Sequence, residues 1–206
     1  MINSKKKLRN YLNEDSLFYK KVSCGYFKCI KNRLVTTPQS STYRIWLYVK
    51  NLRYAEYNKN NSILAKPKGI NSLYHTLCMI YRYWRLRVLS RETGFQIDPG
   101  SFGKGLLIYH YGSIIVNADA KIGDYATIFP GVVIGAKSNG CPVIGNHVMI
   151  GAGAKILGGV HIGNHVTIAP NAVVVKDIPD NAIVVGIPAR ILKFKENEDS
   201  SDKHCI

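Results

Sequence analysis

The sequence lacks an uninterrupted apolar run long enough to cross a bilayer, and its basic start, MINSKKKLRN, leads into no apolar segment of the secretion-signal type. Its five cysteines also lack CxxC or any other metal-ligand spacing, and their number is odd. These absences argue against a secreted, disulfide-bonded protein and against a cysteine metal site. We therefore expect reduced thiols and a cytoplasmic location, with at most peripheral contact at the inner face of a membrane.

Acidic residues are scarce in the first half of the chain. Residues 1–95 contain 19 Lys and Arg but only 4 Asp and Glu, whereas residues 96–206 contain 9 of each. The formal net charge of +15 therefore lies entirely in the first half, together with ten of the thirteen tyrosines. This change in composition predicts a basic helical domain over residues 1–94, a second domain over residues 95–192 and a polar tail over residues 193–206.

Helical spacing of apolar residues predicts two helices in the basic half, over residues 42–57 and 72–92. Ser72 is the expected N-cap of the second helix, and Gly94 is expected to follow its last turn. The apolar stripes are Ile45, Val49 and Leu52 in the first helix, and Leu73, Leu77, Ile80, Trp84 and Val88 in the second.

Three interpretations of the basic half compete. The first is a helical cap that shields one end of the second domain and helps the chain to oligomerise. The second is a platform for an anionic acceptor or an anionic membrane surface. Nucleic-acid binding is the third, but no recognised nucleic-acid-binding module accompanies the charge, so no nucleic-acid partner is expected.

The second half repeats every six residues. The large aliphatic positions are Val116, Ile122, Ile128, Ile134, Ile144, Ile150, Ile156, Ile162, Ile168 and Val174, and small or β-branched residues recur four positions later, from Ala120 to Ile178. Neither a helix nor an ordinary strand has this period. It predicts a mainly β fold, a parallel β-helix in which successive coils of about eighteen residues stack into one core.

The repeat is interrupted once, between Ile134 and Ile144, where four extra residues must leave the coil. The segment 135–142 has the composition of a loop. A loop that protrudes from a regular solenoid is a common location for a functional site, so this segment is expected to help form one.

The second half resembles the serine acetyltransferase branch of the hexapeptide acyltransferases in three segments: GFQIDPGSFGKGLLIYHYGSIIVNADAKIG from residue 94, PVIGNHVMIGAGAKILGGVHIG from residue 142, and VVGIPARI from residue 184. Within that branch it resembles still more closely the capsule and surface-polysaccharide O-acetyltransferases, which carry a similar HYG tripeptide behind a basic helical segment. The resemblance implies a left-handed parallel β-helix, a homotrimer, and acetyl-CoA as co-substrate in clefts between neighbouring solenoids.

The same resemblance implies that His110 is the catalytic histidine and that Asp98 is the carboxylate that orients it. O-acetylation needs a base that removes the hydroxyl proton, and the titration range of histidine suits that task. A carboxylate on the second ring nitrogen would fix the tautomer and stabilise the imidazolium. Twelve residues separate the two here, a few fewer than in the serine enzymes. This difference in spacing bears on the pairing of Asp98 with His110 and leaves the assignment of His110 itself largely unaffected.

The family also implies a binding path for acetyl-CoA. The segment Gly151, Ala152, Gly153, Ala154 and Lys155 corresponds to the rungs that hold the pantetheine arm, where small residues let the arm approach backbone N–H groups. Arg190 and Lys193, in and after the closing motif, are expected to meet the nucleotide phosphates. Glycine-rich rungs and a proline turn are equally what ends a β-helix, so a purely structural role competes with this assignment.

The expected acceptor-binding residues are Tyr109, Tyr111, Asn139, Gly140 and Cys141. Serine acetyltransferases have an Arg-His pair before the proline that restarts the coils and an Asp beside the catalytic histidine; this chain has Gly140-Cys141 and Tyr109. Those replacements remove ionic partners for a free amino acid, so a saccharide of a surface polysaccharide is the expected acceptor. Serine O-acetylation is the first alternative, and a catalytically silent scaffold is the second.

Three further histidines, His147, His161 and His165, occupy outward positions of the repeat and are expected on the surface. Histidines at a subunit junction of a trimeric β-helix can bind zinc, so a metal site is an alternative. The sequence shows no carboxylate placed to hydrogen-bond to these histidines and orient them toward a metal ion. The resemblance also points to acyl transfer, so no metal is expected.

Overall fold

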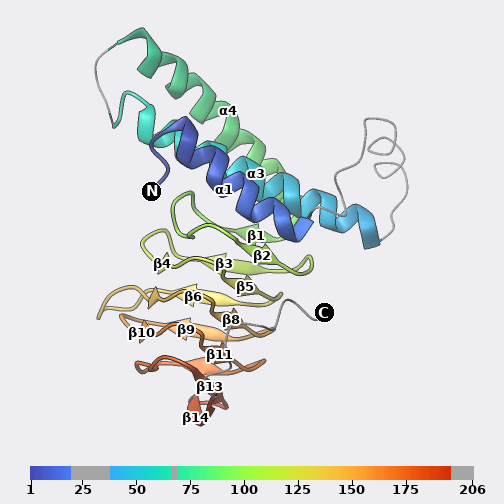
Figure 1. The fold of residues 1–206 in the computed structure, drawn as a ribbon, viewed down its shortest axis with the longest axis vertical. Coiled ribbons are helices and arrows are strands. Elements are labelled where there is room, and N and C mark those ends of the chain that lie inside the picture. The colour runs from blue at the N-terminus through green and yellow to red at the C-terminus, as the bar shows by residue number, and fades with distance from the viewer. Residues whose placement is uncertain (20–37, 66–68, 196–206) are drawn as a thin grey trace.

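The computed structural model describes residues 1–19, 38–65 and 69–195. Three helices, α1 (Lys5–Tyr19), α3 (Pro38–Asn61) and α4 (Ile70–Thr93), lie across one end of a β-solenoid (Figure 1). The solenoid begins at Phe95, directly after α4. The cysteines at 24, 29 and 205 lie outside the described residues, and Cys78 and Cys141 are free thiols. Within the described residues, no helix combines the length and apolar character needed to cross a membrane.

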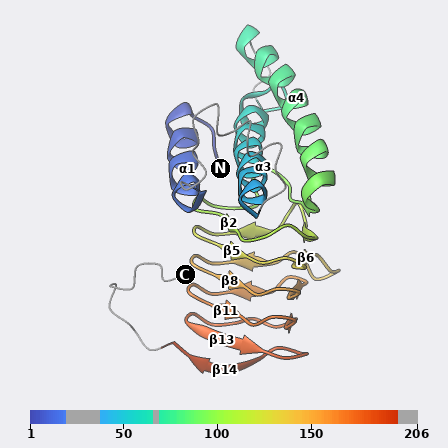
Figure 2. The same cartoon turned by 90° about the vertical axis from the view of Figure 1, so that its right-hand side faces the viewer.

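Short parallel strands form the three faces of the solenoid. Sheet A contains β1 (Phe95–Gln96), β3 (Ile114–Val116), β6 (Val133–Gly135), β9 (Lys155–Leu157) and β12 (Val173–Val174). Sheet B contains β4 (Lys121–Ile122), β7 (Val143–Ile144) and β10 (His161–Ile162). Sheet C contains β2 (Leu107–Ile108), β5 (Thr127–Ile128), β8 (Met149–Ile150), β11 (Thr167–Ile168), β13 (Ala182–Val185) and β14 (Arg190–Phe194). Figure 2 looks onto sheet C, whose strands follow one another down the solenoid.

The six-residue repeat is confirmed as the core of this solenoid. Both repeating series point inward, and every member of them is at most 6% exposed. The coils stack in register, so that Thr127 pairs with Leu107 above it and with Met149 below it. One aliphatic per face therefore suffices to fill the interior, as expected of a solenoid whose repeats bury their apolar face against one another.

The coils differ in length at two corners. From Ile108 to Ile115 the chain takes seven residues to pass from sheet C to sheet A, whereas one coil lower it takes five, from Ile128 to Val133. From sheet A to sheet B, nine residues separate Ile134 from Val143. The coils directly above and below cross that edge in five, from Val116 to Lys121 and from Ile156 to His161. The solenoid thus bulges by two residues around His110 and by four at the loop 135–142.

The helical domain agrees with the sequence in part. Both expected helices exist and are longer than predicted, and α1 was not predicted. Gly94 does follow the last turn of α4, in the left-handed conformation with its N–H donating to the Ser90 carbonyl. The N-cap prediction was wrong: Gly69 occupies the N-cap position without a side-chain cap hydrogen bond. Ser72 lies inside the first turn, where its hydroxyl donates to the Gly69 carbonyl.

The two predicted stripes behave differently. Ile45, Val49 and Leu52 of α3 are fully buried, and they form one core with the first coil. On α4 the inward residues are instead Leu86 and Leu89, and most of the predicted stripe is exposed in the single chain. Helical spacing identified an apolar face correctly but did not identify what covers it.

A buried ion pair attaches the helices to the solenoid. Arg53 of α3 donates to Asp15 of α1 at 2.7 Å, and both side chains are almost fully buried. The same guanidinium donates to the Phe102 and Gly103 carbonyls, while Asp15 accepts from the Leu106 N–H. These contacts satisfy backbone groups of the first coil that have no coil above them, so the helices act as an end cap.

The last strand closes the other end. β14 runs antiparallel to β13, with Arg190 opposite Val185 and Phe194 opposite Ala182. It extends to Phe194, so the boundary predicted between residues 192 and 193 falls within this strand.

Candidate functional site

The predicted site residues lie on two different corners of the solenoid. The His110 corner, between sheets C and A, contains residues 109–113 and, in the coils below, residues 129–132, 151–154 and 169–172. The loop corner, between sheets A and B, contains residues 97–100, 117–120, 135–142 and 158–160. The width of sheet A separates these corners within one chain.

His110 is exposed at the bulge of its corner. The bulge is held from both sides, because the Tyr109 N–H donates to the Ile128 carbonyl and the Gly112 N–H donates to the Thr93 carbonyl. Gly94 has φ +82°, and a Cβ there would lie 3.0 Å from the Gly112 carbonyl carbon. The end of α4 therefore fixes the backbone next to His110, while the imidazole itself stays accessible.

Two tyrosines flank His110. The Tyr109 ring stacks on Phe129 of the next coil, with centroids 4.6 Å apart and an interplanar angle of 7°. The Tyr111 hydroxyl is buried and has no hydrogen-bond partner within the described residues. Burial raises the pKa of Tyr111, an effect that Arg44 opposes and Glu92 reinforces. An unpaired buried hydroxyl is costly, and the packing of the Tyr111 ring against the core offsets that cost.

Most of the predicted acetyl-CoA residues lie below His110 on the same corner. Ala152 is exposed between Gly151 and Gly153, and the Lys155 ammonium donates to the Gly153 carbonyl at 3.1 Å. Gly153 has φ +73°, and a Cβ there would collide with the Asn171 side chain.

At the far end of this corner, the Ala189 N–H donates to the Val173 carbonyl, so Arg190 reaches the same edge. Lys193 lies farther along β14, opposite Ile183 on sheet C. The structure thus places Gly151–Lys155 and Arg190 along the His110 corner, whereas Lys193 lies on the face formed by sheet C.

The loop corner holds the remaining residues. A tight turn, with mutual backbone hydrogen bonds between Lys137 and Gly140, shapes the loop. Asn139 accepts from the Gly159 N–H at 3.2 Å, and the Cys141 thiol donates to Asn117 at 3.5 Å. The loop is therefore attached to the coils above and below it.

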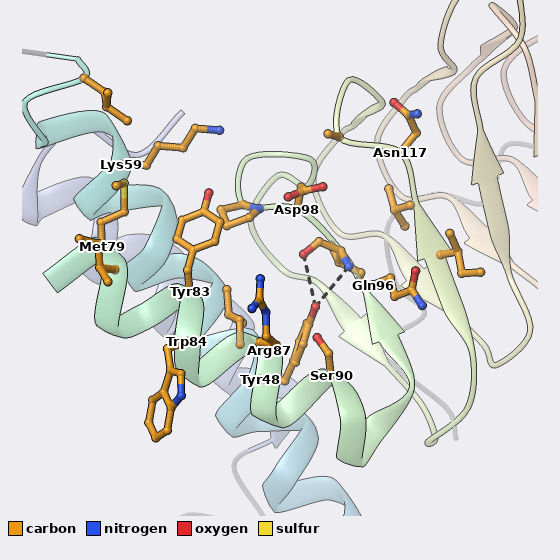
Figure 3. A pocket seen from close by; sticks show the side chains of 18 residues that line it. Tyr48, Lys59, Met79, Tyr83, Trp84, Arg87, Ser90, Gln96, Asp98 and Asn117 are labelled. Carbon is orange, nitrogen blue, oxygen red and sulfur yellow. Dashed lines mark hydrogen bonds between the residues drawn. The ribbon is translucent and has the colours of Figure 1, made fainter. Parts of the chain in front are cut away.

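A pocket of about 840 Å³ lies between α4 and the loop corner of the first coil (Figure 3). Its helical side includes Leu64, Ile80 and Trp84. Polar side chains from both parts of the chain also line it, namely Lys59, Tyr83, Arg87, Ser90, Gln96, Asp98 and Asn117. Tyr48 forms part of the lining; its hydroxyl donates to the Ile97 carbonyl and accepts from the Ile97 N–H. Burial is the main cause that raises the pKa of Tyr48 to about 12, so the phenol stays neutral.

The predicted pairing of Asp98 with His110 does not form within one chain. Asp98 follows β1 and lies in the pocket at the loop corner, whereas His110 precedes β3 at the opposite end of sheet A. No hydrogen bond or ion pair joins these two described side chains. Spacing along the sequence could not reveal this, because it does not say on which corner a residue lies.

His147, His161 and His165 are exposed, as expected. His147 and His165 stack with centroids 4.7 Å apart, and Tyr125 stacks on His147. These rings form a column on the third corner, between sheets B and C. Within the described part of the chain, no three His, Cys, Asp or Glu side chains gather closely enough to bind a metal ion.

Two residues of these corners were not predicted from the sequence. Phe129 stacks on Tyr109. Asn117 lines the pocket and accepts a hydrogen bond from the Cys141 thiol. The signal that identifies them is the register of the coils, in which Leu107 pairs with Thr127 and Ile115 with Val133. That register was hidden because the two bulges shift the repeat.

Comparison with known proteins places the chain in a family. The family described as "Bacterial transferase hexapeptide (six repeats)" matches residues 141–176. A serine acetyltransferase of Helicobacter pylori (strain J99) is 37% identical over 152 residues, which are 67% of this chain and 88% of that protein. One of Synechococcus elongatus is 41% identical over 105 residues, 48% of this chain, and the match spans only 43% of that relative.

A solved structure, a Neisseria gonorrhoeae serine acetyltransferase in complex with serine, has a TM-score of 0.60 and 25% identity, covering 91% of this chain and 70% of that one. All three are named for serine, and a closer relation to polysaccharide O-acetyltransferases finds no support in them. The matches do extend over the solenoid and part of the helical domain. The chain therefore belongs to the serine acetyltransferase family of hexapeptide-repeat transferases.

Proposed function

We propose that the chain transfers the acetyl group of acetyl-CoA to a hydroxyl group, with His110 as the general base. The observation that carries this proposal is the exposed imidazole on a bulged corner, held from both sides by backbone hydrogen bonds, in a chain of the serine acetyltransferase family. A general base must be accessible to the proton that it removes and must not move away during the step.

In the proposed reaction, His110 accepts the proton of the acceptor hydroxyl as its oxygen forms a bond to the thioester carbonyl carbon. The carbon–sulfur bond then breaks, and the proton held by His110 passes to the CoA thiolate. The acetyl group ends as an ester on the acceptor, and the imidazole returns to its neutral form.

The His110 corner, followed down the successive coils, is suited to binding acetyl-CoA. Four coil steps separate Tyr109 from the level of Arg190, through Phe129, Gly151 and Ala169. At ~4.8 Å a step, this is a path of roughly 19 Å, a suitable length for an extended pantetheine arm. Small residues on the path leave the backbone accessible, and Arg190 at its end would meet the phosphates.

We further propose that two copies of the chain complete one site. Asp98, Asn139, Gly140 and Cys141 lie on the loop corner, a sheet width away from His110. In a homotrimer of parallel solenoids, the His110 corner of one chain can face the loop corner of its neighbour. Such a cleft would unite all the predicted residues, with Asp98 of the second copy near His110 of the first.

Two acceptor classes are candidates, L-serine and a saccharide. The names of the relatives favour L-serine, and they favour it over the saccharide that the sequence pattern puts first. One specific set of observations supports the saccharide: Tyr109 and Gly140-Cys141 supply no charge for an amino acid, and the adjoining pocket of about 840 Å³ is much larger than serine requires.

An acceptor assay tests the proposal. The purified chain is incubated with acetyl-CoA and either L-serine or a panel of sugars, including nucleotide-linked ones, and products are detected by mass spectrometry. An acetyl ester with release of free CoA is expected for one acceptor class. Efficient transfer to L-serine would exclude the saccharide, and turnover of neither class would overturn the proposed activity.

A further inference from the structure

The outer face of α4 is apolar and uncovered in the chain. This surface, here called the α4 outer face, consists of Ile70, Leu73, Tyr74, Leu77, Ile80, Tyr81 and Trp84, which are 49 to 85% exposed. Leu64, in the turn after α3, adds to it and is 81% exposed. A contiguous apolar patch of this kind on a soluble domain indicates a surface that another body covers.

The position of α4 leaves this face accessible. α4 lies on the side of α3 that faces away from α1, and its first half extends beyond the solenoid (Figures 1 and 2). Its inward residues, Leu86 and Leu89, pack on the core, and they are concentrated in the second half of the helix. The first half is therefore held mainly by α3 and presents its other side outward.

The charge around this face has one sign. Residues 57–91 contain seven Lys and Arg and no Asp or Glu. Lys59, Arg87 and Arg91 are exposed, whereas Arg82 is engaged with Asn51 and with the ring of Tyr54. A partner that covers the α4 outer face must therefore combine an apolar interior with a negative border.

We propose that the α4 outer face docks on the surface of an anionic lipid bilayer. Its leucines and isoleucines would enter the boundary between headgroups and acyl chains, where an amphipathic helix buries its apolar face. Trp84 and the two tyrosines have the apolar body and polar edge that suit this depth. Arg87 and Arg91 would meet lipid phosphates. A second copy of the chain is the weaker occupant, because pairing α4 with α4 brings together two basic segments without an acidic partner.

Vesicle co-sedimentation tests this proposal with the full chain. We expect binding to vesicles of phosphatidylcholine and phosphatidylglycerol in equal amounts, little binding to phosphatidylcholine alone, and weaker binding as salt is raised from about 0.05 to about 0.5 M. The double substitution Leu73→Gln and Leu77→Gln, at two positions outside the pocket, should reduce partition at least ~10-fold, since each removes an apolar side chain from the lipid. The matched control, Leu192→Gln, changes an exposed leucine at the opposite end of the chain and should bind like the parent.

Tryptophan fluorescence supplies a second measurement. The chain has two tryptophans, Trp46 and Trp84, and the substitution Trp46→Phe leaves Trp84 as the only reporter. Its emission should shift to the blue on anionic vesicles and be quenched by brominated acyl chains. Three outcomes would overturn the proposal: no binding, binding that the double substitution leaves unchanged, or, in sedimentation velocity without vesicles, an assembly of twice the mass of the trimer that the double substitution reduces to the trimer. The last would identify a second copy as the occupant.

Discussion

His110 is the side chain on which the proposed chemistry depends most directly. It is exposed, and the backbone beside it is bonded to Thr93 and Ile128. The substitution His110→Ala removes the base and leaves that backbone intact, so kcat should fall by about 10²–10⁴-fold with little change in stability. Release of CoA thiol, followed with a thiol reagent, measures this rate. His161→Ala, an exposed histidine on β10, is the control and should remain active; equal rates for both variants would exclude His110 as the base.

Asp15 has a structural task that can be separated from catalysis. It is fully buried against Arg53, and both also bind backbone groups of the first coil. Asp15→Asn leaves the guanidinium buried without its counter-charge, so the free energy of unfolding should fall by about 3–5 kcal/mol. Urea unfolding followed by circular dichroism measures this change.

The exposed pair of Arg44 and Glu92 provides the matched control for Asp15. Its partners are about 40% exposed, and Glu92→Gln should change the free energy of unfolding by only ~0–1 kcal/mol. If Asp15→Asn proved as mild as Glu92→Gln, the buried pair would not be what attaches the helices to the solenoid.

At the scale of elements, we predict that the stability of the column of rings on the third corner depends on pH. Burial, and after it the neighbouring His165, lower the pKa of His147 below its usual value of 6.5, while Asp124 opposes them. Lys104 lies over the ring of Tyr125 at the top of the column. Because the folded chain binds the proton on His147 less well than the unfolded chain does, the stability that this group contributes is present above about pH 6.5 and is lost as the pH falls below it.

His147→Asn removes that titration without disturbing the corner. The backbone at 147 has φ +55°, a conformation that asparagine tolerates and that Asn171 and Asn181 already adopt in this solenoid. The fall in melting temperature between about pH 7.5 and about pH 5 should therefore be smaller in the variant than in the parent. His161→Asn, outside the column, should leave the fall unchanged; an identical pH profile for His147→Asn would show that the column does not sense pH.

Elements were predictable where a regular repeat determined them. The aliphatic positions from Val116 to Val174 identified the solenoid core, because burying one face of each repeat leaves no other arrangement. The start of α4 was missed because Ser72 resembles a cap, whereas the N-cap position is occupied by Gly69, which makes no side-chain cap hydrogen bond. The placement of Asp98 was missed for a different reason: a corner is defined by coil register, and the two-residue bulge at His110 is visible only after the coils are stacked.

The whole molecule raises the question of how many chains make one site. The His110 corner and the loop corner both depart from the regular coil, by two and by four residues, yet they lie at opposite edges of sheet A. If both departures serve the proposed reaction, they must meet, and within a single chain they do not. A second copy that brings its loop corner to the His110 corner resolves this, and closed symmetry would then generate equivalent sites around a trimer.

Mixing two inactive variants tests that assembly. His110→Ala chains lack the base but keep Asp98, whereas Asp98→Asn chains lack the Asp98 carboxylate but keep His110. If each site takes His110 from one chain and Asp98 from the next, co-refolding equal amounts should restore about a quarter of the parental activity, because both partners are intact in roughly one of four neighbouring pairs. Co-refolding His110→Ala with His110→Asn should restore nothing. Activity in the first mixture no higher than in its components would place the complete site in one chain, and full activity of Asp98→Asn alone would remove Asp98 from the site.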